Sequence, residues 1–225
     1  MNLHQKPPFW LKTLTASRMV WQLPPGNNCV YLTFDDGPNV GATTRALDIL
    51  KSNNAHATFF VQGAKAAVQP QLIKQILQEG NGLGYHGWQH LDGWKTSLPE
   101  YLENTQRQFS SIRLKLFRPP YGRITPQQVL AIRQRDYRII MWSLSAQDYN
   151  TKVCPAKSFA FLKKHVCDGS IVLFHDTITA QPAFTKILEL LLDFMHLSGL
   201  NAKPLPDAFV LHEPKPSAKI DTFAF

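Results

Sequence analysis

The chain has 225 residues, of which 44% are hydrophobic and 18% are charged, a composition that excludes a disordered protein. Its length favours a single α/β domain over two small ones. Lysine and arginine outnumber aspartate and glutamate by 24 to 16, a formal charge of +8 that indicates either an anionic partner or a solvated basic surface. The basic residues form no run and do not alternate with aromatic residues, so no nucleic-acid partner is expected.

Residues 1–28 are predicted to form an N-terminal extension that packs on the main domain. Prolines and the charged residues Lys6, Lys12 and Arg18 interrupt this segment, so it lacks the apolar core of a signal peptide. No run of eighteen apolar residues occurs in the sequence, so no transmembrane segment is expected. These features by themselves predict a cytoplasmic protein.

Short β-like runs then alternate with amphipathic helix patterns along the chain. Strands are predicted at residues 30–34, 57–61, within 80–87, and at 116–118, 137–143 and 170–174. Helices are predicted at residues 43–51, 70–79, 97–114, after Thr125, after Pro155, and over 184–195. This alternation predicts a parallel sheet but leaves open whether it is a doubly wound sheet or a barrel.

The main domain is expected to span residues 29–210, with a C-terminal tail at 211–225. The proline-rich segment from residue 204 onwards is predicted to supply a last strand before that tail. The three cysteines, Cys29, Cys154 and Cys167, form no metal-binding pair, and their odd, sparse count does not indicate an oxidising compartment. Cys29 and Cys167 lie in apolar patterns and are predicted to be buried thiols.

Polar residues follow the predicted strands at one end of each. They are Asp35, Asp36, His86, His90, Arg118, Asp148, His175 and Asp176. Because the carboxyl ends of parallel strands form one face of an α/β fold, these residues can converge although they are far apart in the sequence. This placement is the strongest indication of a functional site that the residues give on their own.

The residue types in this set suggest a metal centre. Asp35 and Asp36 repel each other unless a cation neutralises them. His86 and His90 are four residues apart, a spacing that places both rings on one side of a helical turn, and they lie in a glycine-rich segment that can bend. Two imidazoles and one carboxylate bind a divalent metal and leave positions open, while the second carboxylate and His175 could serve as general base and general acid. Taken singly, each residue also fits an ordinary turn, surface or strand-end position.

Several short motifs resemble those of the NodB-like polysaccharide deacetylases, carbohydrate esterase family 4. The motifs of residues 33–38 (TFDDGP), 86–90 (HGWQH), 118–121 (RPPY) and 173–175 (LFH) are similar to the first, second, third and fifth family motifs. The fourth is recognisable but altered around Asp148. The resemblance covers about residues 29–210 and implies a distorted (β/α) barrel with seven parallel strands, similar to a TIM barrel.

The resemblance also implies roles for individual residues. The implied metal ligands are Asp36, His86 and His90, and the metal is zinc, with cobalt or nickel as alternatives. The implied catalytic residues are Asp35 as base, His175 as acid, Arg118 as the partner of Asp35, and Asp148 as the partner of His175. The implied substrate-binding residues are Tyr121, through its backbone N–H, and Tyr149, in the wall of the sugar groove.

Three positions depart from the family pattern. Gly87 stands where the family usually has serine or threonine, whose side chain steadies the loop between the two histidines. Ser145 replaces the first acid of the fourth motif, and Tyr149 replaces its tryptophan. Because no implied ligand, base or acid is lost, we expect an active site with an altered substrate preference.

The sequence thus predicts a hydrolase that removes N-acetyl or O-acetyl groups from an acylated amino-sugar polymer such as peptidoglycan or a chitin-type glycan. This substrate class suggests the cell envelope, in contrast to the N-terminal segment. Two alternatives are a catalytically silent glycan-binding module of the same fold and a metal-dependent esterase or phosphoesterase acting on a non-sugar substrate.

Overall fold

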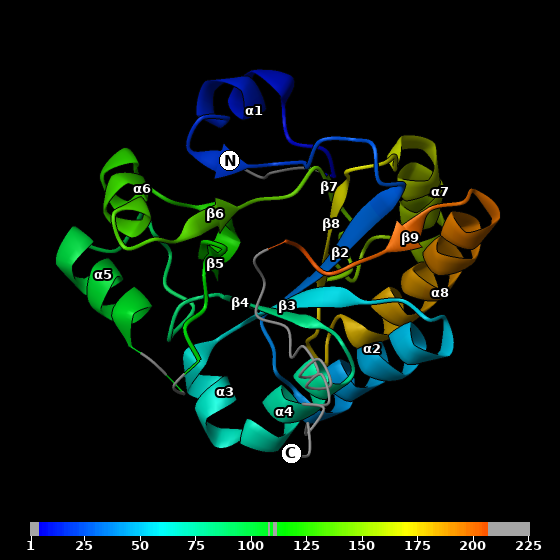
Figure 1. Ribbon diagram of the computed structural model, residues 1–225, viewed down its shortest axis with the longest axis horizontal. Coiled ribbons are helices and arrows are strands. Elements are labelled where there is room, and N and C mark those ends of the chain that lie inside the picture. The colour runs from blue at the N-terminus through cyan, green and yellow to red at the C-terminus, as the bar shows by residue number, and fades with distance from the viewer. Residues whose placement is uncertain (1–4, 108, 110–111, 207–225) are drawn as a thin grey trace, which may run out of the picture.

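The computed structural model describes residues 5–107, 109 and 112–206. Strands occupy its centre and helices surround them (Figure 1). The strands are β1 (Met19–Val20), β2 (Cys29–Asp35), β3 (Ala57–Val61), β4 (Gly82–Tyr85), β5 (Leu116–Phe117), β6 (Arg138–Ile140), β7 (Leu144–Ser145), β8 (Ile171–His175) and β9 (Asn201–Ala202). They form one parallel sheet in the order β1-β6-β5-β4-β3-β2-β8-β7, with β9 also paired to β2.

The connections between the strands supply the surrounding helices. These are α1 (Phe9–Thr15), α2 (Val40–Ser52), α3 (Gly63–Val68), α4 (Pro70–Gln78), α5 (Leu98–Gln106), the 3₁₀ turn η1 (Pro120–Gly122), α6 (Pro126–Arg133), α7 (Pro155–His165) and α8 (Gln181–Leu197). The six apolar positions that predict one face of α8 are all buried: Phe184, Ile187, Leu188, Leu191, Leu192 and Met195. Their burial confirms the helical period that the sequence indicates.

Residues 138–145 cross from one side of the curved sheet to the other. β6 pairs with β5 on one side of the sheet, β7 pairs with β8 on the other, and only residues 141–143 separate β6 from β7. Of the predicted strand at 137–143, only Arg138–Ile140 forms a strand, and the chain then changes partner and continues as β7, just beyond the predicted range. The distorted barrel is confirmed, and the described residues form nine strands rather than seven, four of which (β1, β5, β7 and β9) are only two residues long.

The N-terminal extension covers the place where β6 and β7 diverge. β1 pairs with β6, the Leu23 N–H donates to the Gly169 carbonyl before β8, and the Ser145 N–H in β7 donates to the Gln5 carbonyl at 2.8 Å. Sequence patterns predict neither α1 nor β1, since both are short. The extension therefore satisfies backbone groups that the change of partner would leave unpaired.

Aromatic rings fill the interior between β2 and its neighbours. Phe34 stacks on Phe59 and on Phe174, with ring centroids 5.0 and 5.5 Å apart, and meets the ring of Phe184 edge-on. All seven residues of β2 are buried, as expected for a parallel strand covered on both faces. This strand is the rigid support of the candidate site.

Three other expectations differ from the structure. The helix expected over 97–114 ends at Gln106, because Arg107 has extended backbone and its carbonyl accepts from the Tyr85 hydroxyl at 2.6 Å. The last strand precedes residue 204 instead of following it, and the tail at 211–225 lies outside the described residues. Cys29 is buried, but Cys167 is exposed because it lies in the turn between α7 and β8. Within the described ranges, we found no helix that has the length and apolar character to span a bilayer.

Candidate functional site

The carboxyl ends of four strands carry the polar residues that the sequence singles out. Asp35 is the last residue of β2 and pairs in register with His175, the last residue of β8. His86 follows β4, and Arg118 follows β5. The parallel register therefore places these side chains at one edge of the sheet, as predicted.

The turn after β2 separates the two adjacent carboxylates. Asp36 adopts a φ of 78°, in the left-handed region, so its side chain diverges from that of Asp35. Two residues of the next βα connection hold this turn: Gln62 donates to Asp36 Oδ1 at 3.2 Å, and Lys65 donates to the Asp36 carbonyl at 2.7 Å. Sequence reasoning missed both, although Gln62 directly follows the predicted strand at 57–61.

Asp36, His86 and His90 bring their ligand atoms together, all within 4.8 Å of one another. Asp36 Oδ1 lies 3.0 Å from His90 Nε2 and 3.5 Å from His86 Nε2. Burial by itself opposes ionisation of Asp36, but hydrogen bonds with His86 and His90, together with the charges of His86 and His175, outweigh burial and hold its pKa well below the usual range. The cluster is the kind of site at which an anionic carboxylate and two imidazoles bind a metal ion.

A partner behind the cluster fixes the orientation of His86. Its Nδ1 lies 2.8 Å from the Arg118 carbonyl, and because a carbonyl only accepts, Nδ1 carries the proton. Nε2 is therefore the ring atom turned towards Asp36, the orientation in which it can ligate a metal ion. This donor set fits a divalent metal such as zinc, with coordination positions left for water and substrate.

The segment from His86 to His90 is a loop and not a helical turn, and the glycine-rich segment bends so that the two rings meet, as the sequence indicates. Gly87, at φ 80°, bends the chain. Asn104 of α5 clamps the loop: its side chain accepts from the Gln89 N–H at 2.7 Å and donates to the Gln89 carbonyl at 3.0 Å, and its own carbonyl accepts from the Trp88 N–H. Asn104 thus holds a loop that Gly87 cannot steady with a hydroxyl.

Asp35 stands beside the cluster and is held by a buried guanidinium. Arg118 Nη1 donates to Asp35 Oδ1 at 2.8 Å, while Asp35 Oδ2 lies 3.9 Å from His86 Nε2. Arg118 has no exposed surface, and its remaining donors reach Thr33 Oγ1 and the carbonyls of Ile140 and Met141. Although burial lowers the pKa of Arg118, the charge and hydrogen bond of Asp35 oppose that effect, so the two groups stabilise each other as an ion pair.

Across the same edge, Asp148 binds His175 at two points. It accepts from the His175 backbone N–H at 2.7 Å and from Nδ1 at 2.9 Å. Burial of the imidazole disfavours its charged form, but Asp148, with smaller contributions from Asp36 and Asp35, raises the pKa of His175 to about 9. His175 is therefore protonated at neutral pH and has a proton to donate.

These groups line a cavity of about 330 Å³. Its lining residues are Asp35, Asp36, His86, His90, Tyr121, Gly122, Arg123, Trp142, Ser145, Tyr149, Leu173 and His175. The ring centroids of Tyr121 and His90 lie 4.3 Å apart, and those of Tyr149 and His175 lie 5.0 Å apart, so each tyrosine packs against a histidine of the candidate site. Tyr121 has a φ of 57°, which turns its backbone sharply after the third motif. Sequence reasoning missed Trp142 and Leu173, which look like ordinary core residues in their strands.

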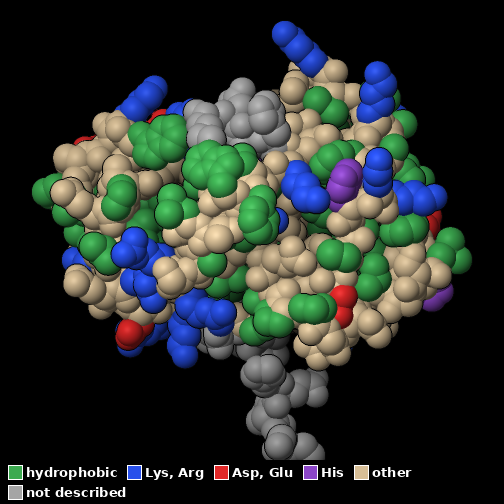
Figure 2. All heavy atoms as spheres, turned by 90° about the horizontal axis from the view of Figure 1, so that it is seen from above, with side chains coloured by type: hydrophobic (Ala, Val, Ile, Leu, Met, Phe, Trp, Pro, Cys, Tyr) green, Lys and Arg blue, Asp and Glu red, His purple; other side chains and the backbone are tan. Residues whose placement is uncertain are grey.

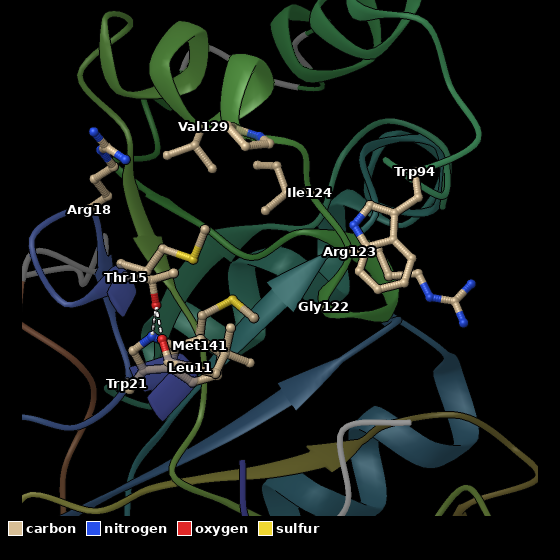
Figure 3. Close-up of a pocket in the computed structure, with 12 residues that line it drawn as sticks. Leu11, Thr15, Arg18, Trp21, Trp94, Gly122, Arg123, Ile124, Val129 and Met141 are labelled. Atoms are coloured by element: carbon tan, nitrogen blue, oxygen red, sulfur yellow. Dashed lines mark hydrogen bonds between the residues drawn. The ribbon is translucent and has the colours of Figure 1, made fainter. Parts of the chain in front are cut away.

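A second, apolar cavity of about 180 Å³ adjoins the first, and Gly122 and Arg123 line both (Figure 3). The N-terminal extension contributes Leu11, Thr15 and Trp21 to it, and Arg123 and Trp94 lie at its opposite side (Figure 3). Arg123 donates to Asp92 at 2.5 Å and lies over the Trp94 ring at 5.1 Å. The extension thus reaches the neighbourhood of the candidate site.

Asp176 is a buried acid behind the site. Its carboxylate accepts from Thr43 Oγ1 at 2.5 Å, and its carbonyl accepts from the Asn39 side chain at 2.6 Å. Burial, opposed by the Thr43 hydrogen bond and assisted by the charges of Asp36 and Asp35, raises the pKa of Asp176 to about 7. Asp176 joins β8 to the turn that carries Asp36, and it does not line the cavity.

The fold and the site define a parallel β/α-barrel protein with a cluster of three metal-type ligands, a paired carboxylate and a charged imidazole at the carboxyl ends of its strands. A family model described as polysaccharide deacetylase matches residues 22–140. The chain belongs to that family, and its resemblance to the NodB-like deacetylases of carbohydrate esterase family 4 is confirmed. Asp148 and His175 lie beyond the matched residues.

Known relatives agree with this assignment. The chain is 33% identical over 179 residues to the peptidoglycan-N-acetylmuramic acid deacetylase PdaC of Bacillus subtilis, covering 75% of this chain but only 37% of PdaC, little more than a third of its length. The crystal structure of the Bc1960 peptidoglycan N-acetylglucosamine deacetylase superposes with a TM-score of 0.79 at 26% identity, covering 90% of this chain and 96% of that one. A pseudoenzyme of the same family from Bacillus anthracis shares the fold, with a TM-score of 0.73 at 21% identity over 82% of this chain and 66% of that one.

Proposed function

We propose that the protein is a metal-dependent deacetylase that hydrolyses the N-acetyl group of an amino sugar in a peptidoglycan-type polymer. The observation that carries the proposal is the convergence of three metal-type ligands, a separate carboxylate and a protonated imidazole on one cavity. The relatives named as peptidoglycan deacetylases support this substrate class. An O-acetyl group on the same kind of glycan is the second candidate for the bond that is cleaved.

The residues divide the chemistry between them. Asp36, His86 and His90 would hold a divalent metal, zinc first and cobalt or nickel as alternatives, which supplies a Lewis acid and lowers the pKa of water. Asp35 takes up the proton of the attacking water, and Arg118 keeps that carboxylate oriented by its hydrogen bond to Oδ1. The free Oδ2 of Asp35 is then available as the acceptor.

Collapse of the tetrahedral intermediate requires a proton for the leaving amine. His175, protonated through Asp148, donates it, because an amine departs poorly as an anion. The Tyr121 backbone N–H assists by stabilising the oxyanion, and Tyr149 forms part of the wall against which the sugar lies. Ser145 has no carboxylate to offer here, so the local polar support that the first acid of the fourth motif would give is absent at that position.

Acetate release from N-acetylglucosamine oligomers and from purified peptidoglycan tests the proposal directly. The protein purified with zinc should release acetate, and Asp35→Asn should lose activity by two orders of magnitude or more while it retains the metal. Absence of acetate release from every acylated glycan, or equal rates for Asp35→Asn and the unaltered protein, would contradict it. Simple acetate esters and phosphodiesters in the same assay distinguish the non-sugar esterase.

Metal content after purification separates the deacetylase from a silent glycan-binding module. The deacetylase should contain one divalent metal per chain, and His86→Ala with His90→Ala should abolish both metal binding and acetate release. A protein that binds glycan but contains no stoichiometric metal would be the silent module. Gly87, Ser145 and Tyr149 motivate that alternative, but all of the implied ligands converge.

A further inference from the structure

The helix α1 exposes a strip of large apolar side chains. Phe9, Trp10 and Leu14 are 80%, 55% and 74% exposed, and α1 contains no buried residue. They occupy positions i, i+1 and i+5 of the helix, which fall within an arc of about 140° on the side away from Leu11 and Thr15. Exposed apolar side chains gathered on one short element, instead of scattered singly, mark a surface for interaction.

The opposite side of α1 is fixed to the molecule. Leu11 packs against the core and, with Thr15, lines the apolar cavity beside the candidate site (Figure 3). Thr15 Oγ1 accepts from Trp21 Nε1 at 2.8 Å, and Trp21 is 6% exposed. The strip formed by Phe9, Trp10 and Leu14 is therefore held in place and directed outward.

The surroundings of this strip are basic. The first 34 residues contain Lys6, Lys12 and Arg18 but no aspartate or glutamate. Within the described ranges these three cations form no ion pair, and burial together with repulsion from Lys6 lowers the pKa of Lys12. Figure 2 looks onto the end of the molecule that carries α1, and there hydrophobic side chains lie beside lysine and arginine with few acidic side chains.

We propose that α1 and its flanking cations dock the protein on an anionic lipid surface. Aromatic and aliphatic side chains on one side of a helix insert at the boundary between headgroups and acyl chains, and neighbouring lysine and arginine residues bind the acidic headgroups. A chain of net charge +8 adds a long-range attraction to such a surface. The charge complementarity favours lipid over a second, equally basic copy of this chain.

The docked surface would lie beside the catalytic cavity. Leu11 and Thr15 of α1 line the apolar cavity, and Gly122 and Arg123 connect that cavity with the one containing the metal-type ligands. Lipid docking would therefore present the cavity to glycan that lies close to a membrane. This consequence rests on the proposed deacetylase function, whereas the docking itself does not.

The full chain should be tested by vesicle flotation, without a catalytic readout. Vesicles of phosphatidylcholine alone are compared with vesicles containing equal parts of phosphatidylglycerol, at 0.1 M and 0.5 M salt. Partitioning to the anionic vesicles should be at least tenfold stronger and should fall at the higher salt concentration. Replacing Lys6, Lys12 and Arg18 by glutamine should weaken it by about fivefold for each charge.

A matched pair of triple variants tests the apolar strip. Phe9→Ser, Trp10→Ser and Leu14→Ser together should lower partitioning at least tenfold, while Val68→Ser, Ile178→Ser and Leu197→Ser, which alter equally exposed apolar residues elsewhere, should leave it within twofold. Circular dichroism confirms that both variants fold. Equal binding to the two vesicle types, or equal effects of the two triple variants, would overturn the proposal. Lipid-independent self-association that only the α1 variant abolishes would also overturn it and identify a second copy as the partner.

Discussion

At the scale of single residues, Asp148 controls the charge of His175. The carboxylate is 1% exposed and accepts from both the backbone and the ring of His175, and it is the largest cause that raises the pKa of His175 to about 9. A group whose pKa is raised in the folded state contributes stability that is present below its unfolded pKa and is lost as the pH rises through the folded value. The same titration removes the proton that the leaving amine requires.

Asp148→Asn should therefore move the alkaline limb of the activity profile to lower pH, by one pH unit or more. Asparagine can still accept from the His175 N–H, so the loop should keep its position, while the charge that stabilises the imidazolium is lost. The pH dependence of kcat/KM, together with an NMR titration of His175, measures the shift. An unchanged alkaline limb would show that another group holds the proton.

Gly87 is a second residue whose surroundings leave no room for a larger side chain. A Cβ at this position would lie 2.6 Å from Asn104 Nδ2 and 3.0 Å from the Gln89 carbonyl, and the φ of 80° is strained for any other residue. Backbone strain alone should cost about 1–2 kcal/mol, and Gly87→Ala should lower the free energy of unfolding by more than that because of the two close contacts. The change should also weaken metal binding, because the loop carries both candidate histidine ligands.

Gly199→Ala is the matched control for that change. Its φ of 67° imposes similar strain, but a Cβ there meets nothing within 4 Å, and the residue is remote from the histidines in the sequence. Gly199→Ala should lower the free energy of unfolding only by the backbone strain and should leave the metal affinity unaltered. Denaturant titrations and metal titrations of the two variants measure both effects, and equal metal affinities would show that Asn104 does not position the loop.

At the scale of elements, two helix starts of similar sequence behave differently. Thr125 accepts from the Gln128 N–H, and the Gln128 side chain accepts from the Thr125 N–H, so α6 begins with the capping box that its sequence predicts. Ser97 precedes α5 with the same type of sequence, yet its side chain makes no capping hydrogen bond. The sequence locates both helix starts but does not determine which hydroxyl accepts a capping hydrogen bond.

Thr125→Ala should consequently lower the free energy of unfolding by about 1 kcal/mol, the usual value of a lost N-cap. Ser97→Ala, at the equivalent position of α5, should change it by less than about 0.5 kcal/mol, because no capping bond is removed. Urea denaturation of the two variants provides the comparison. A loss at Ser97 as large as that at Thr125 would mean that the cap forms in solution.

At the scale of the whole molecule, strand ends were the most informative part of the sequence. Asp35, His86, Arg118 and His175 each follow a run with strong β character, and because parallel strands share one carboxyl edge, their convergence could be predicted. The crossing from β6 to β7 could not be predicted, since residues 137–143 read as one continuous strand, whereas pairing to β5 ends at β6 and β7 pairs with β8. Asn104 was missed for the same reason: its contact with the histidine loop depends on how α5 packs.

The N-terminal extension binds both β6 and β7, through β1 and through the Gln5 carbonyl. Trp21 anchors this extension. Trp21 is 6% exposed and lies between β1, which pairs with β6, and Gln22, which bridges to Ser170 before β8. Trp21→Ala should lower the free energy of unfolding by about 3–5 kcal/mol, whereas Trp10→Ala, 55% exposed in the same extension, should cost less than about 0.5 kcal/mol.

Hydrogen exchange locates the effect of the Trp21 change. The Met141 N–H donates to the Val20 carbonyl and the Ser145 N–H donates to the Gln5 carbonyl, so both amides depend on the extension. In Trp21→Ala they should lose protection before the amides of β2, whose partners on both sides belong to the barrel itself. Uniform loss of protection across the sheet would instead indicate that the extension and the barrel unfold as one cooperative unit.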